Sequence, residues 1–310
     1  MTPLLKVDSL KKQYPLRGRA LFRQASAKFS ALQDVSFDLN PGEILVIAGE
    51  PGSGKTTLAR SLALLVRPNG GTILFEKSDL TKQNDNALRA VRRRLQVLFS
   101  DPRTALNPQS LVGEVMFEPM RVQRIGTEEE RTVAVKQALR QVGLNAMLLD
   151  RRLTTLSGGQ RQQVALARLL TLRPALVICD DPARTLPAAE PFFRLMADLR
   201  HKDGIAFIWI VGQPQPAVSF ADRVGILHRG HLVELGKAEA VLKTPQHPYT
   251  SRWLGDGRAS ETPDKGPVMK GCSFQSECPR VMPVCRERAP SMFNTPSSQT
   301  AACFLYEAQS

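Results

Sequence analysis

The chain has few cysteines and no long hydrophobic run among its 310 residues. No apolar stretch approaches the roughly 18 residues needed to span a bilayer, so we expect any membrane contact to be peripheral. Residues 1–6, MTPLLK, contain no apolar signal-peptide core, which favours a cytoplasmic protein. Five cysteines are too few for a secreted disulfide scaffold, and the sequence has neither internal repeats nor low-complexity tracts.

Basic residues are in excess, with a formal net charge of +13 and a pI near 9.9. This charge permits nucleic acid, an anionic membrane face or a nucleotide as partner, and it does not choose among them. The hydrophobic content of 42% with 23% charged residues is typical of a folded globular protein. The length predicts two domains, or one domain with a large insertion.

One segment, residues 44–58 with the sequence ILVIAGEPGSGKTTL, indicates a ligand directly. Its apolar run leads into a match to the phosphate-binding pattern G-x-x-x-x-G-K-[ST]. The glycines let successive N–H groups point into one anion-sized hollow, and the helix expected near Thr56 adds free amides. We expect Lys55 to reach the β- and γ-phosphates of a nucleotide and the Thr56 hydroxyl to bind Mg²⁺. The residues predicted to bind the nucleotide are Gly49, Gly52, Ser53, Gly54, Lys55, Thr56 and Thr57.

The hydrophobic pattern of the remaining chain alternates between strands and helices, which predicts an α/β protein. Apolar and polar residues alternate within residues 4–40, as they do in edge or antiparallel strands. The helical spacing of apolar residues over 111–147 predicts an all-helical insertion, which we place at about 103–160. Further strands are expected at 72–75, 95–99, 175–179, 207–211 and 224–227, and further helices at 58–66 and 164–170.

The expected strand at 175–179 is continuously apolar, as in strands buried on both faces, and it leads into Asp180 and Asp181. Because open α/β sheets bind ligands at the carboxyl ends of their strands, Asp180 is a candidate magnesium-binding carboxylate. Residues 156–160, LSGGQ, come before the helix expected at 164–170. Small residues that open a helix would present free amides to an anion, so this segment is a second candidate binding element.

Three segments in this order and spacing resemble the ATPase subunits of ATP-binding-cassette (ABC) transporters: the phosphate loop, LSGGQ at 156–160 and LVICD at 176–180. Residues 12–15, 100–108 and 246–250 resemble the dipeptide and oligopeptide importer branch of this family. The long basic insert before residue 31 resembles the second of the two unlike ATPases in that branch, and the resemblance covers nearly the whole chain.

The resemblance implies a P-loop NTPase fold with a RecA-like α/β core, an antiparallel β subdomain and a helical insertion. We expect this ATPase domain over residues 1–255. Residues 256–270 are rich in Asp, Gly, Pro and Lys, which indicates a linker. We therefore expect residues 256–310 to form a linker and a small C-terminal extension that carries cysteines.

The resemblance also implies the ATP-binding subunit of a heteromeric importer for di- or oligopeptides, on the cytoplasmic face of the cell membrane. Its partners would be a second, non-identical ATPase, two transmembrane permease subunits and, indirectly, an extracytoplasmic substrate-binding protein, with no nucleic acid. Tyr14 resembles the aromatic residue that stacks on adenine, and residues 100–108 resemble the surface that faces the permeases. In this family each ATP lies between the phosphate loop of one subunit and the signature of the other. The residues implied to act on the partner's ATP are Ser157, Gly158, Gly159 and Gln160.

Four positions depart from the hydrolytic pattern of that family. Ser100 replaces a glutamine, Asp181 replaces the glutamate that acts on the attacking water, and Gly212 replaces a histidine at the γ-phosphate. A general base displaced by ~1 Å can lose on the order of a hundredfold in rate. The fourth change, Pro187 for an aspartate, lies in a loop that serves the opposite site. We hypothesise that the chain binds ATP in its own site, where Asp181 is a weakened catalytic residue, and supplies an intact signature to the partner's site. A symmetric pair with both sites slowed is the alternative.

Four of the five cysteines lie after residue 270, with the spacing C-x5-C-x6-C-x17-C. This spacing matches neither the C-x2-C pairs of zinc sites nor the ferredoxin runs, and clustered thiols by themselves indicate only a soft metal. Some peptide-importer ATPases carry a similar tail that holds a [4Fe-4S] cluster, so the resemblance implies one here, with structural zinc and unliganded thiols as alternatives. Cys179 is expected to pack in a core strand. The implied cluster ligands are Cys272, Cys278, Cys285 and Cys303.

Two other classes of function stay open at this point. A soluble cassette protein acting on nucleic acid would suit the net charge, although such proteins usually carry two cassettes in one chain. A regulatory nucleotide-binding subunit with no productive site is the other class. The sequence does not name the transported solute, whether peptide, nickel or another, because other subunits select it.

Overall fold

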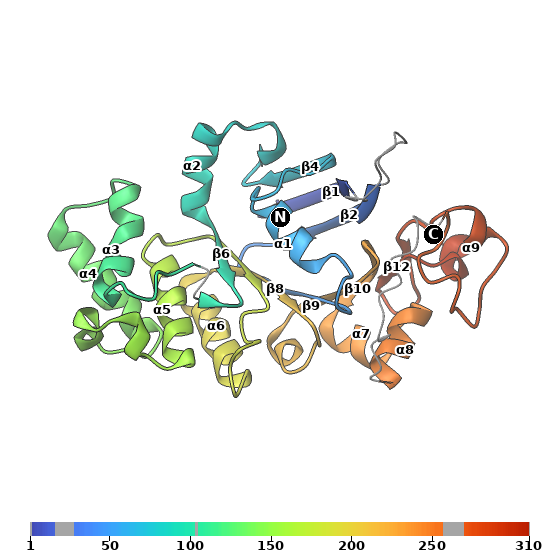
Figure 1. Cartoon of the computed structure of the whole chain (residues 1–310). Helices are drawn as coiled ribbons and strands as arrows, with labels where there is room; N and C mark the ends of the chain where they lie inside the picture. The colour runs from blue at the N-terminus through green and yellow to red at the C-terminus, as the bar shows by residue number, and fades with distance from the viewer. Residues whose placement is uncertain (1, 16–27, 103–104, 257–269, 310) are drawn as a thin grey trace, which may run out of the picture. The chain divides into compact units, whose positions relative to one another are not determined.

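The structure, a computed structural model, describes residues 2–15, 28–102, 105–256 and 270–309 (Figure 1). The chain divides into two compact units. Unit 1 comprises Met1–Asn40, Leu45–Lys82 and Val211–Ser310, and unit 2 comprises Pro41–Ile44 and Gln83–Ile210. Each unit has a buried apolar interior of its own.

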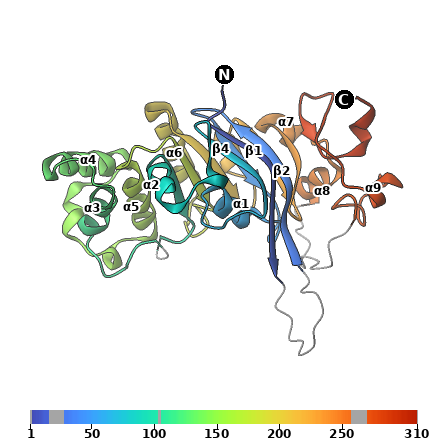
Figure 2. The ribbon, with the colours of Figure 1, turned by 90° about the horizontal axis from the view of Figure 1, so that it is seen from above.

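An antiparallel sheet in unit 1 has the strand order β2-β1-β4-β5, and its long strands lie side by side in Figure 2. The strand β1 pairs Leu5 with Leu39 of β2 and with Phe75 of β4. Along β1, Leu5, Val7 and Leu10 are buried and the residues between them are exposed, so the antiparallel strands predicted within 4–40 are confirmed for residues 5–15 and 28–39. The strands are β1 (Leu5–Pro15), β2 (Lys28–Leu39), β4 (Gly70–Phe75) and β5 (Ser78–Asp79).

A second set of strands in unit 1 has the order β11-β12-β10-β9-β3. The strand β3 is buried along its whole length and runs parallel to β9, as its continuous apolar sequence predicts. The strands β9 and β10 form an antiparallel hairpin, and β12 of the C-terminal extension pairs with the other side of β10. The strands are β3 (Ile44–Ala48), β9 (Arg223–His228), β10 (His231–Lys237), β11 (Phe293–Asn294) and β12 (Thr300–Ala301).

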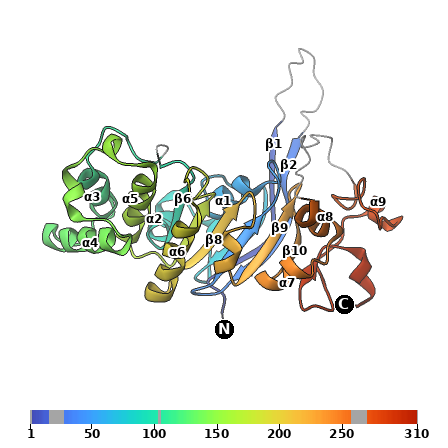
Figure 3. The same cartoon turned by 90° about the horizontal axis from the view of Figure 1, so that it is seen from below.

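The first helix of unit 1, α1 (Lys55–Leu62), begins directly after the phosphate loop. It begins before the helix predicted at 58–66 and ends before it, at Leu62, because Leu64 has a φ of 51°, which takes the backbone out of the helical region. Two later helices, α7 (Ala238–Lys243) and α8 (Pro248–Asp256), lie beside β10 in Figure 3, and the short helix α9 (Val284–Glu287) belongs to the C-terminal extension. Residues 257–269 fall outside the described residues, so the linker and the boundary at residue 255 stay predictions.

Unit 2 contains three parallel strands in the order β8-β7-β6. The register places Phe99 beside Asp180, and Asp180 beside Ile210. Every residue of β7 and β8 is buried, and the strands predicted in these places are confirmed. The strands are β6 (Leu95–Phe99), β7 (Leu176–Asp180) and β8 (Ala206–Val211).

Helices predicted over residues 111–147 are present in unit 2 and lie beside α5 (Figure 1). The start of α4 is fixed by a capping box, in which Thr127 Oγ1 accepts the Glu130 N–H at 3.3 Å and Thr127 N–H donates to Glu130 at 2.7 Å. Within the described ranges, no helix is both long and apolar enough to cross a membrane. The helices are α2 (Asp85–Arg94), α3 (Val112–Val122), α4 (Glu128–Gln141), α5 (Gly158–Leu170) and α6 (Glu190–Asp203), with short 3-10 turns at Ala146–Asp150 and Leu153–Thr155.

Candidate nucleotide-binding site

The phosphate loop connects β3 to α1, and its glycines are required by close backbone contacts. A Cβ atom on Gly49 would lie 2.2 Å from the Leu227 carbonyl oxygen, and one on Gly54 would lie 2.3 Å from the Ala31 carbonyl oxygen. Gly54 also has a φ of 105°, in the left-handed region that favours glycine. Larger residues at these two positions would therefore displace the loop.

The ammonium group of Lys55 lies across this loop. It donates hydrogen bonds to the carbonyl oxygens of Gly49 at 2.6 Å and Glu50 at 2.7 Å, and it lies 3.4 Å from Ser53 Oγ. The first turn of α1 contains no acidic residue, so its N-terminal amides and positive dipole end keep their attraction for an anion. The loop thus joins a lysine, a helix N-terminus and the exposed Thr56 in the arrangement that binds nucleotide phosphates.

Tyr14, the candidate adenine-stacking residue, lies near the end of β1 in unit 1. It pairs with Phe29 of β2 and is half-buried. The Lys12 ammonium lies 5.1 Å from the centre of the Tyr14 ring and donates to the Arg67 carbonyl at 2.8 Å. The basic insert at 16–27 falls outside the described residues, so the adenine contact of Tyr14 stays a prediction.

In unit 2 the parallel strands β6 and β7 bring Ser100 and Asp181 to equivalent positions, because each follows one member of the Phe99–Asp180 pair. Asp180 is buried, with a relative exposure of 9%. Asp181 has a φ of 53°, and its N–H donates to the Ile210 carbonyl at 2.7 Å. The carboxyl end of this sheet therefore holds the two acidic residues that the sequence predicts for magnesium binding and catalysis.

The signature forms the open N-terminus of α5. Ser157 Oγ accepts the Gln160 N–H at 3.1 Å, and the Gln160 side chain accepts the Ser157 N–H at 3.0 Å, which completes a capping box. A Cβ atom on Gly158 would meet no described heavy atom within 4 Å, and one on Gly159 would meet only Ser157 Oγ at 4.0 Å. The first turn again contains no acidic residue, so this surface is open to an anion.

Two of the departures from the family pattern are not required by packing. Gly212 in unit 1 has no described heavy atom within 4 Å of where a Cβ would lie, and its φ is outside the left-handed region. The backbone there would accept a histidine. Pro187 in unit 2 is exposed. The packing of the described residues therefore does not require glycine at position 212 or proline at position 187.

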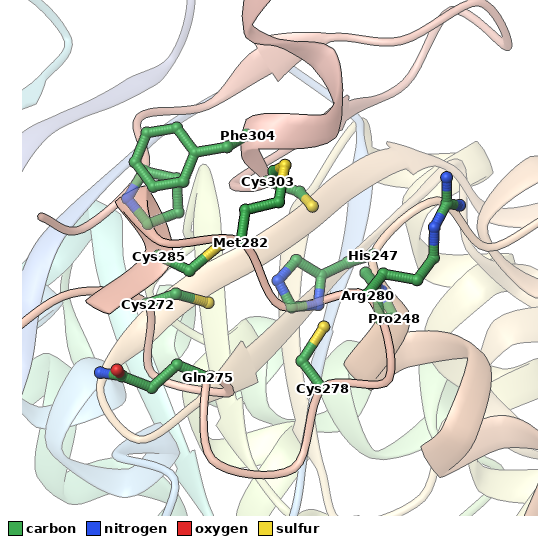
Figure 4. Close-up of a pocket in the computed structure, with 11 residues that line it drawn as sticks. His247, Pro248, Cys272, Gln275, Cys278, Arg280, Met282, Cys285, Cys303 and Phe304 are labelled. Atoms are coloured by element: carbon green, nitrogen blue, oxygen red, sulfur yellow. The ribbon is translucent and has the colours of Figure 1, made fainter. Parts of the chain in front are cut away.

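The four C-terminal cysteines line one cavity in unit 1 together with His247 and Met282 (Figure 4). Cys272 N–H donates to the Cys285 carbonyl at 2.8 Å, which joins two of the cysteine segments. Burial raises the pKa of the Cys272 thiol to about 11, and the neighbouring thiols add to the rise. Burial also raises the pKa of Cys303.

The donor set of this cavity fits a soft metal, but its geometry is not that of a formed metal site. Among the described residues, no group of three or more His, Cys, Asp or Glu is arranged to hold a metal ion. All five cysteines are described and none forms a disulfide. Cys179 is buried in β7 with its sulfur 3.8 Å from Met196 Sδ, as expected of a packed residue. The described residues therefore show four thiols around one cavity but no formed cluster site, and the iron–sulfur cluster expected from the resemblance stays a prediction.

A mixed α/β core with a phosphate loop, an antiparallel β sheet and a helical segment ending in LSGGQ defines an ATP-binding cassette. The sequence model of the ABC transporter family matches residues 32–184, and that of the oligopeptide/dipeptide transporter C-terminal region matches residues 233–285. The chain belongs to the ABC transporter ATP-binding proteins of the oligopeptide and dipeptide transporter type.

Relatives of similar length support this assignment. The probable peptide ABC transporter ATP-binding protein y4tS of Sinorhizobium fredii is 35% identical, over 97% of this chain and 90% of that protein. The oligopeptide transport ATP-binding protein AppF of Bacillus subtilis is 33% identical, over 98% of this chain and 97% of that protein. Among solved structures, the dimeric post-hydrolysis cassette MJ0796 bound to ADP and Pi matches with a TM-score of 0.65 and 25% identity, covering 76% of this chain and 98% of that one.

Proposed function

We propose that this chain is the ATP-binding subunit of an importer for di- or oligopeptides, at the cytoplasmic face of the cell membrane. It would work with two transmembrane permease subunits, a second and non-identical ATPase, and indirectly an extracytoplasmic substrate-binding protein. The observation that carries the proposal is the combination of a complete phosphate loop, an open LSGGQ helix and the two family matches in one chain.

The roles of the individual residues follow from their chemistry. Lys55 and the amides at the start of α1 would hold the β- and γ-phosphates. Thr56 and Asp180 would bind Mg²⁺, and Tyr14 would stack on adenine. Ser157 and the glycines after it would contact the γ-phosphate of an ATP held by the partner. Their support is the accessible N-terminus of α5, where Gly158 has no described neighbour to exclude a phosphate.

We further propose that this chain hydrolyses ATP poorly in its own site. Asp181 is one methylene shorter than the usual glutamate, and a displacement of ~1 Å can reduce the rate on the order of a hundredfold. Ser100 is too short to replace a glutamine at Mg²⁺, and Gly212 offers no side chain at all. Binding depends mainly on the phosphate loop, which is intact. Turnover would then occur in the partner's site, completed by this chain's signature.

ATP turnover of the purified, assembled transporter tests this asymmetry. We expect Ser157→Arg in this chain to abolish turnover, because it blocks the partner's site, and Lys55→Ala to leave a substantial part. Ser291→Arg, at another exposed serine, is the matched control and should have no effect. Loss of turnover in Lys55→Ala with tolerance of Ser157→Arg would show that this chain's own site is the catalytic one.

We also propose that Cys272, Cys278, Cys285 and Cys303 hold a [4Fe-4S] cluster. Support comes from their soft donors around a single cavity, since such clusters are held by four cysteine thiolates. Anaerobic purification should give about four iron and four sulfide per chain. Stoichiometric zinc would indicate a structural zinc site instead, and metal-free protein with four reactive thiols would contradict both.

A further inference from the structure

The turn between β9 and β10 touches the phosphate loop directly, and both lie in unit 1. Gly230 N–H donates to the Ser53 carbonyl at 2.8 Å. At the other end of the loop, the Leu227 carbonyl oxygen lies so close to Gly49 that a Cβ would come within 2.2 Å of it. The end of β9 and the turn after it therefore contact the phosphate loop at two places, Gly49 and Ser53.

The C-terminal extension holds the same turn from another direction. The ring of Phe274 meets the ring of His228 edge-on, with centroids 5.9 Å apart at 87°. The Glu277 carboxylate lies 3.9 Å from the Arg229 guanidinium. Phe274 is only 2% exposed, so its contacts are made in a packed interior. Two residues of the extension thus contact the two residues that connect Leu227 to Gly230.

Helix α8 strengthens this arrangement. The Tyr249 ring packs against the His228 ring, with centroids 3.9 Å apart and planes tilted by 35°, and its centroid lies 5.5 Å from that of Phe274. Arg252 forms a 2.6 Å ion pair with Glu277. Burial raises the pKa of the Tyr249 hydroxyl, and the nearby Glu50 carboxylate of the phosphate loop adds to the rise. The extension, α8 and the loop therefore share one packed region.

The cysteine cavity is connected to this region through short segments. Phe274 is two residues after Cys272, and Glu277 immediately precedes Cys278. His247, which lines the cavity, accepts the Tyr249 N–H at 3.0 Å through Nδ1. A change of packing in the cavity would reach the β9–β10 turn through two or three residues.

We propose that Phe274 and Glu277 are positioning residues for the nucleotide site, because they hold the β9–β10 turn against the phosphate loop. This inference rests on the proposed function, in which the loop binds ATP. It gives the cysteine-bearing extension an indirect effect on nucleotide affinity. Neither residue touches the nucleotide, so each acts only through the turn.

The test measures two properties of the full-length chain: the Kd for a fluorescent ATP analogue with Mg²⁺, and hydrogen exchange of the amides in residues 49–54 without nucleotide. We expect Phe274→Leu, which keeps apolar volume but removes the ring contacts, to weaken binding about fivefold. Glu277→Gln should weaken it about twofold, and high salt should remove that difference. Both variants should speed exchange in the loop.

Two controls in the same extension separate this effect from general loosening. Glu307→Gln breaks the 2.6 Å pair with Arg288, and Glu287→Gln removes an exposed carboxylate from the same extension. Both should leave the Kd and loop exchange unchanged. If Phe274→Leu does not fold, Glu277→Gln decides the question alone. Wild-type affinity and loop exchange in the folded variants would overturn the inference, whereas a wild-type chain that binds no ATP would overturn the proposed function.

Discussion

The phosphate loop and the signature are both glycine-containing segments that open a helix, yet their glycines serve different needs. Cβ atoms on Gly49 and Gly54 would collide with carbonyl oxygens of this chain, at 2.2 and 2.3 Å. A Cβ on Gly158 would meet no described atom. The loop is thus shaped by its own chain, whereas the signature leaves room for something outside it. This difference supports the proposal that the first binds a nucleotide for itself and the second acts on a partner's.

The largest expected difference between the glycines of the phosphate loop and those of the signature is in the free energy of unfolding. Gly54→Ala should destabilise the chain by about 3 kcal/mol, because it adds a backbone collision to a left-handed φ. Gly158→Ala should change stability by less than about 0.5 kcal/mol. Denaturant unfolding of the two single variants measures both values. Equal losses of stability in the two variants would show that the glycines of the loop and of the signature do not differ in this way.

Restoring the family residues at three positions tests the same comparison through the rate of ATP hydrolysis. The triple change Ser100→Gln, Asp181→Glu and Gly212→His should raise hydrolysis in this chain's own site by up to about a hundredfold. Turnover would be measured with the partner's phosphate-loop lysine replaced, so that only this chain's site works. A triple variant that folds, binds ATP and stays inactive would show that something other than these residues limits the site.

The third comparison concerns pH: the unfolding free energy should fall in acid because of His228, which lies beside the phosphate loop. Burial lowers the pKa of His228, beside the loop, from 6.5 to about 3, so the folded state holds it neutral. The unfolded chain takes up the proton near pH 6.5, so the stabilising contribution is full above that pH and is lost as the pH falls toward 3. At pH 5 we expect a loss of about 2 kcal/mol. His228→Phe should flatten the pH dependence of the unfolding free energy, whereas His201→Gln, at an exposed histidine, should not.

The smallest effect tests the signature cap. Ser157→Ala should cost about 1 kcal/mol of stability, as should Thr127→Ala, which breaks the same kind of capping box on α4. Only Ser157→Ala should lower turnover of the assembled transporter. If Thr127→Ala lowers turnover equally, the loss comes from the helical segment and not from the signature.

The elements that sequence analysis predicted were those with strong local patterns. The apolar runs of β3 and β7 and the glycine spacing at 49–54 are readable because each depends on nearby residues alone. The helices α2 and α6 were missed. A cap at Asn84, whose side chain accepts the Ala87 N–H at 2.9 Å, and Gly204 after α6 were local signals that marked their ends.

For the site, the motifs gave the correct positions of the loop, the signature and the acidic residues, but not their surroundings. The contact of His228 with Tyr249 and Phe274 joins three segments that are far apart in the sequence, and no periodicity predicts it. The clustering of the four cysteines in the sequence indicated that they come together, as they do around one cavity. The arrangement of their thiols in that cavity could not be predicted from the spacing. The individual roles of Tyr14, Asp180 and Asp181 stay predictions.

The pairing of β12 with β10 has a consequence for how the chain behaves in isolation. β10 is bonded to β9 on one side and, through Glu234↔Ala301 and Leu235↔Thr300, to the extension on the other. Without residues 293–301, Glu234 and Leu235 of β10 would lose these strand partners, and an unpaired strand edge favours edge-to-edge aggregation. The C-terminal extension therefore also covers part of the edge of β10. Truncating the chain before it should lower solubility even where the cassette itself still folds.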